Sequence, residues 1–122
     1  MSLNEINWLK EPRESNYPAA ISYLTLCFPE KKAKSLVRKL KQAKMTTFKA
    51  KDIFRASRLN LLGLKNRHVD ANLTKIKSGE ELSPILLVRD PLSNRVIIAD
   101  GYHRLSAVYA QCEDADIPCK IV

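Results

Sequence analysis

The residues best suited to chemistry lie together between Asp100 and Arg104, in the order Asp-Gly-Tyr-His-Arg. An apolar run precedes them and apolar residues at helical spacing follow, a pattern typical of a strand that turns directly into a helix. The first N–H groups of a helix have no helical partner and attract anions. Gly101 permits a tight turn, His103 offers a donor, and Arg104 offers a two-pronged donor that matches phosphate oxygens. The segment therefore predicts a phosphate-binding turn.

Asp100 is the candidate catalytic residue of this turn, and three roles are open to it. It could cap the helix, contact a bound magnesium ion, or position a substrate hydroxyl. The alternative interpretation of the whole segment is architectural. Asp-Gly is a common turn, and a His-Arg pair is also found at solvated helix starts.

A strand hairpin and two helices are predicted around this turn. Residues 84–88 form a continuous apolar run, typical of a strand buried on both faces, and residues 95–99 form the returning strand. Helical apolar stripes occupy residues 68–77 and 105–112, and residues 117–122 are a closing strand. Strands and helices are intermixed, so the expected fold class is mixed α+β.

A helical hairpin is predicted ahead of that region, and Pro18 stands near the start of its first helix. The expected apolar stripes are Ala20, Tyr23, Leu24 and Cys27 in the first helix, and Ala33, Leu36, Val37, Leu40 and Ala43 in the second. Cys27 and Cys112 are therefore expected to be small core residues. A short edge strand at residues 46–50 and a short helix at residues 52–56 follow.

The ordered series Pro84-Ile85-Leu86-Leu87-Val88, then Val96 to Arg104, then Ile117-Pro118 resembles the ParB/sulfiredoxin superfamily. Members share a helix, a Pro-Ile-Leu-Val-like strand, a hairpin return, a glycine-containing turn, a helix and a closing strand. The resemblance covers residues 46–122. It implies a single domain, residues 1–122, with a ParB/sulfiredoxin-like mixed sheet and packed helices, preceded by a helical extension at residues 1–45.

The resemblance implies three different activities at the turn. Sulfiredoxins carry a pattern similar to Gly-Gly-Cys-His-Arg at this turn, and its cysteine is the catalytic nucleophile. Tyr102 takes the place of that cysteine in this chain. A phenol, with a pKa of ~10, is a poor replacement for a thiolate nucleophile. Free-serine kinases carry a similar Asp-Gly-His-His-Arg turn, which favours a small-molecule phosphotransferase or an ATP-hydrolysing enzyme. ParB proteins bind CTP at this turn and carry a helix-turn-helix for DNA that has no counterpart in this sequence.

The resemblance also implies which residues hold the ligand. The ligand would be a nucleotide (ATP, ADP or CTP) with Mg²⁺. At the turn the implied nucleotide contacts are Gly101, Tyr102, His103 and Arg104. Lys65, Arg67, His68 and Lys75, on and just before the helix at residues 68–77, form the implied second wall. No metal-ligand spacing is present among the histidines and cysteines.

The charge of the chain is concentrated in one segment. The net charge is +8, and residues 30–58 hold eleven Lys or Arg against two acids, Glu30 and Asp52. Such a segment can attract nucleic acid, which makes a non-enzymatic nucleic-acid-binding or regulatory module the alternative function. The simpler interpretation is that the lysines solvate the outer face of a helix.

The composition of the sequence indicates the cellular compartment that is expected for the protein. No window has the ~18 consecutive apolar residues of a membrane span, and the start of the chain lacks a signal-peptide pattern. The three cysteines include no CxxC pair. Reduced thiols in the cytoplasm are therefore expected.

Overall fold

The computed structural model describes residues 5–60 and 66–122 and is built around strand β2 (Ile85–Asp90). β2 pairs antiparallel with β3 (Arg95–Asp100) on one side and parallel with β4 (Asp116–Ile121) on the other. β1 (Thr46–Lys49) pairs antiparallel with the far edge of β4. The resulting mixed sheet has the order β1-β4-β2-β3. Mixed α+β architecture is confirmed.

The apolar run in β2 supplies both hydrophobic cores because successive side chains of a strand point to opposite faces. Ile85 and Leu87 pack into one cluster, while Leu86 and Val88 pack into the other. All four side chains are buried. The prediction of a strand buried on both faces is confirmed.

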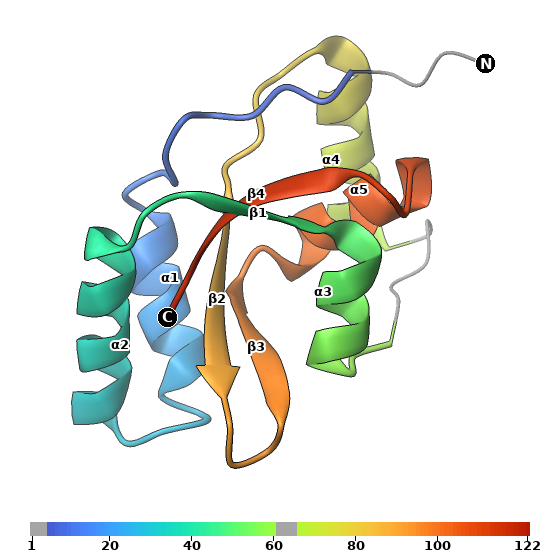
Figure 1. Ribbon diagram of the computed structural model, residues 1–122. Helices are drawn as coiled ribbons and strands as arrows, with labels where there is room; N and C mark the ends of the chain where they lie inside the picture. Colours follow the sequence, from blue (N-terminus) through green and yellow to red (C-terminus); the bar gives the residue numbers. More distant parts are fainter. Residues whose placement is uncertain (1–4, 61–65) are drawn as a thin grey trace.

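Helices cover both faces of the sheet (Figure 1). On one face lie α3 (Ala50–Ser57), α4 (Arg67–Ser78) and α5 (Tyr102–Gln111). On the other face lies the helical hairpin of α1 (Asn16–Leu24) and α2 (Glu30–Gln42), whose buried residues form one cluster with β2 and β3. The hairpin is thus a layer of the same packed structure. None of the helices in the described ranges is long and apolar enough to cross a membrane.

The predicted elements are found within a few residues of their expected positions, but the stripe of the first helix is only half right: Ala20 and Leu24 are buried. Tyr23 and Cys27 were expected on the buried face of the first helix, and both are exposed. α1 ends at Leu24, so Cys27 lies beyond the helix and its helical phase does not apply. Cys112 is partly buried.

A buried lysine joins the hairpin to the sheet. Lys120 of β4 is only 3% exposed, and its ammonium donates to the carbonyl of Lys41 at 2.9 Å and lies 3.3 Å from Glu11 Oε1. Lys41 is in the last turn of α2, where carbonyls lack helical partners and a positive charge is favourable. Burial lowers the pKa of Lys120, but its bonds to Tyr17 and Glu11 outweigh that effect and raise the pKa above its ordinary value of 10.5.

We expect Lys120→Met to lower the free energy of unfolding by about 1–3 kcal/mol, because it leaves a helix-terminal carbonyl without its charged donor. Since the pKa is raised in the folded protein, this stabilisation is complete below the unfolded pKa and is lost as pH rises through the folded pKa. Urea unfolding of both proteins at neutral and alkaline pH measures it. Lys39→Met, at an exposed position of α2, should change stability by less than about 0.5 kcal/mol. Equal effects of the two substitutions would contradict this role of Lys120.

Candidate functional site: the turn between β3 and α5

The strand-to-helix turn takes the conformation that its glycine makes available. β3 ends at Asp100, Gly101 adopts φ +110°, and α5 begins at Tyr102. A Cβ atom on Gly101 would lie 2.8 Å from Ile85 Cγ1 and 2.9 Å from Arg104 Nη2. Glycine is therefore required by both the backbone and the space.

The start of α5 keeps N–H groups free. The first helical hydrogen bond joins the Leu105 N–H to the Gly101 carbonyl, and within the described residues no side chain caps the helix. The N–H groups ahead of Leu105 consequently lack helical partners and carry the positive end of the helix dipole. Asp100 does not act as the cap that was one of its expected roles.

Asp100 is instead held by Arg104. Arg104 Nη2 lies 2.7 Å from Asp100 Oδ2, and Arg104 Nη1 donates to Asn16 Oδ1 at 3.2 Å. The two charged side chains are only 15% and 21% exposed. Asn16 Oδ1 also accepts from Ser83 Oγ at 2.5 Å. The guanidinium fork, expected to face a phosphate, is thus engaged within the protein, and its positive charge helps to fix the turn.

Helix α4 supplies the second wall. His68, Asn72 and Lys75 follow each other at i, i+4 and i+7, so they share one face of the helix. Together with residues of the turn they line a mainly polar hollow of about 230 Å³. The residues lining it are His68, Asn72, Lys75, Asp100, Gly101, His103 and Arg104. Six of these seven residues were predicted, and the structure brings them together.

Two of the other predicted residues stand apart from this hollow. Arg67 is exposed and does not line it. The Tyr102 hydroxyl donates to the carbonyl of Asn60, and Tyr102 lines a neighbouring hollow of about 370 Å³. Lys65 lies outside the described residues. The sequence interpretation missed two residues, Asn72 and Asn16. The helical spacing of Asn72 from His68 could have indicated the first of them.

The electrostatics of the hollow favour an anion. Lys75 and Arg104 contribute two positive charges, and Asp100 is the one carboxylate among the described residues that line it. The rings of His68 and His103 are in contact, with their centroids 4.8 Å apart and their planes tilted by 47°. Burial, and to a lesser degree the neighbouring His68, lower the pKa of His103, so this imidazole is neutral at pH 7. A bound anion would favour its protonated form.

No protein-family model, curated protein or solved structure matches this chain. Over residues 5–60 and 66–122, no three His, Cys, Asp or Glu side chains gather closely enough to hold a metal ion. Asp100 is the residue of the hollow that could contact Mg²⁺, and it would do so while paired with Arg104.

We expect Gly101→Ala to destabilise the protein by more than about 2 kcal/mol, because it combines a strained backbone with a steric overlap. Gly79→Ala is the matched control. Gly79 also has positive φ (+80°), but the nearest atom to its Cβ would be 3.8 Å away, so only the backbone strain of about 1 kcal/mol remains. Equilibrium urea unfolding measures both. Equal losses would show that the turn tolerates a side chain.

Proposed function

We propose that the hollow between α4 and the start of α5 binds the phosphate groups of a nucleotide. The observation that carries this proposal is the convergence of an uncapped helix start with Lys75, His68 and His103 on one polar hollow. Helix N–H groups and ammonium groups are common ligands of phosphate oxygens. The resemblance of the strand-turn-helix series to the ParB/sulfiredoxin superfamily supports ATP, ADP or CTP as the ligand.

The residues divide into ligands and a positioning residue. The free N–H groups of α5, the Lys75 ammonium and the two imidazoles would contact phosphate. Arg104 would contribute positive charge while it holds Asp100 and Asn16 in place. The neighbouring hollow shares Asp100, Gly101 and His103 with the first and presents Tyr23 and Tyr102 as flat surfaces beside it.

A phosphotransferase activity would need a group that orients the acceptor hydroxyl. Asp100 has the required chemistry, since a carboxylate accepts a hydrogen bond from a hydroxyl and is a common ligand of Mg²⁺. Its proposed role is to hold either the hydroxyl or Mg²⁺ beside the transferred phosphoryl group. Tyr102, which stands where sulfiredoxins carry a cysteine, is engaged with the Asn60 carbonyl and is not proposed as a nucleophile.

We expect ATP, ADP or CTP to raise the melting temperature of the protein, and Lys75→Glu to abolish the shift. A ligand at about 100 times its Kd stabilises by about 2.7 kcal/mol, which is readily measured. Each nucleotide is tested with and without Mg²⁺. Lys77→Glu is the matched control, because Lys77 is exposed on the same helix but does not line the hollow. No shift with any nucleotide, or equal loss in both variants, would contradict the proposal.

Sulfate provides a second test of the same hollow, because its own charge is constant between about pH 6 and 8, where histidine titrates. The pKa of His103 is lowered in the free protein, so the bound anion must recruit a proton to this ring. Sulfate affinity should therefore rise as pH falls, and His103→Ala should remove much of that dependence. A pH-independent affinity would exclude the imidazoles as ligands.

The outer face of α2 favours a second function, nucleic-acid binding. Lys31 and Arg38 are exposed on the side of α2 opposite its buried stripe, and no acid pairs with either in the described ranges. Lys49, Lys51 and Arg55, in contrast, lie within 4.0 Å of carboxylates. Most of the unpaired positive charge of residues 30–58 thus lies on α2, while Lys44 and Arg58 lie outside it.

If α2 contacts a phosphate backbone, Lys31→Glu/Arg38→Glu should weaken the binding of single- and double-stranded DNA and RNA. It should also reduce the slope of log affinity against log salt by about two, one for each lost contact. Fluorescence anisotropy at several salt concentrations measures this. Arg67→Glu/Lys77→Glu, with the same change of charge on α4, is the control. Equal effects of the two pairs would indicate attraction to net charge without a defined surface.

A further inference from the structure

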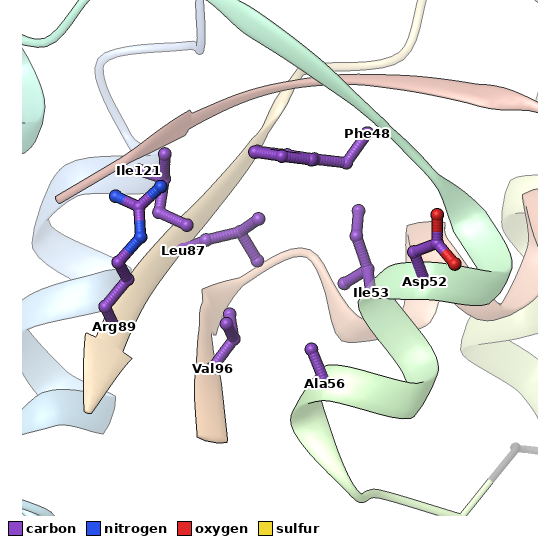
Figure 2. A pocket seen from close by; sticks show the side chains of 8 residues that line it. All are labelled: Phe48, Asp52, Ile53, Ala56, Leu87, Arg89, Val96 and Ile121. Carbon is purple, nitrogen blue, oxygen red and sulfur yellow. The ribbon is translucent and has the colours of Figure 1, made fainter. Parts of the chain in front are cut away.

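A second hollow lies on the α3 side of the sheet, away from the turn that begins α5. It has a volume of about 190 Å³ and shares no lining residue with the hollow between α4 and α5. Figure 2 shows the side chains that surround it, which come from α3 and from strands β1 to β4. They are Phe48, Asp52, Ile53, Ala56, Leu87, Arg89, Val96 and Ile121.

Two of the side chains that line this hollow belong to the buried core. Ile53 and Leu87 are 3% and 1% exposed, yet both line the space. Leu87 and Val96 come from neighbouring strands, and Phe48 lies across from them (Figure 2). On α3, Ala56 faces this space with a single methyl group, which is too short to fill it. The hollow is thus apolar and is left open by a small residue.

One cation stands at its edge. Arg89 is two residues beyond Leu87 in β2 and therefore points to the same face of the sheet. Its guanidinium lies beside Ile121 in Figure 2. The side chain is exposed, and none of the ion pairs among the described residues includes it. Asp52 stands at the opposite end, 3.9 Å from Arg55.

Size and charge together define the ligand. An apolar cavity of about 150 Å³ accepts benzene, so this slightly larger hollow accepts one ring with a short substituent. A guanidinium with free donors binds a carboxylate through two parallel hydrogen bonds. We propose that the hollow beneath α3 binds a small aromatic carboxylate, with its ring against Leu87, Val96 and Ile121 and its carboxylate on Arg89.

The proposal is tested with phenylacetate as the probe and 2-phenylethanol as its uncharged counterpart. Titrations are followed by the NMR signals of the methyl groups of Ile53, Leu87 and Ile121. Phenylacetate should shift these signals saturably and bind at least about tenfold more tightly than the alcohol, because a hydrogen bond to a charged group is lost with the alcohol. Equal affinities would overturn the role of Arg89. Shifts spread over the surface without saturation would overturn the site.

Two substitutions separate the roles of charge and space. Arg89→Gln should lower the phenylacetate affinity at least tenfold and leave that of the alcohol unchanged. Ala56→Leu should fill the hollow and block both probes. Arg67→Gln, at an exposed position of α4 that does not line this hollow, is the control and should change neither affinity. Because Arg89 is exposed, its variant keeps the proposal testable even if Ala56→Leu fails to fold. Unchanged phenylacetate binding in Arg89→Gln would overturn the proposal.

Discussion

The guanidinium of Arg104, held between Asp100 and Asn16, is the interaction on which the candidate site depends. It joins the end of β3 and the first turn of α5 to the first residue of α1, and Ser83 extends the network to the residues before β2. Removing one partner of a partly buried ion pair leaves an uncompensated charge, which is far more costly than losing a surface pair. The N-terminal hairpin and the turn between β3 and α5 are therefore joined by direct contacts, although they lie far apart in the sequence.

Local patterns predicted what is locally determined. The strand β2 and the helix α4 were predicted correctly. Their apolar residues recur at the spacing that burial on a strand or on one helix face requires. His68 and Lys75 share a helical face, so their joint presence at the hollow follows from spacing, whereas Arg67 is one residue out of phase and points elsewhere. The contact of Arg104 with Asn16 spans 88 residues and leaves no signal in spacing. The exposure of Cys27 was missed because the end of α1 lacks a strong stop signal before it.

The two hollows differ in polarity, although both lie on the side of the sheet that α3, α4 and α5 cover. The hollow beside α5 is polar and can exchange water for an oxyanion, whereas the hollow under α3 offers hydrocarbon with a single cation at its edge. The strongest positive charge lies on α2, on the opposite side of the sheet from α3 to α5 (Figure 1). The two hollows and the outer face of α2 therefore differ in polarity and in charge.

The topology of the sheet also determines the order in which it can form. β1 has β4 as its sheet neighbour, and β4 alone connects β1 to β2, yet more than sixty residues separate β1 from β4 along the chain. At about 5–20 residues per second, a ribosome needs several seconds to synthesise that interval. During this time the β1 segment, with Phe48, has no strand to pair with. The hairpin of β2 and β3 can form first, and the sheet is completed only when β4 pairs with β1 by closing a long loop.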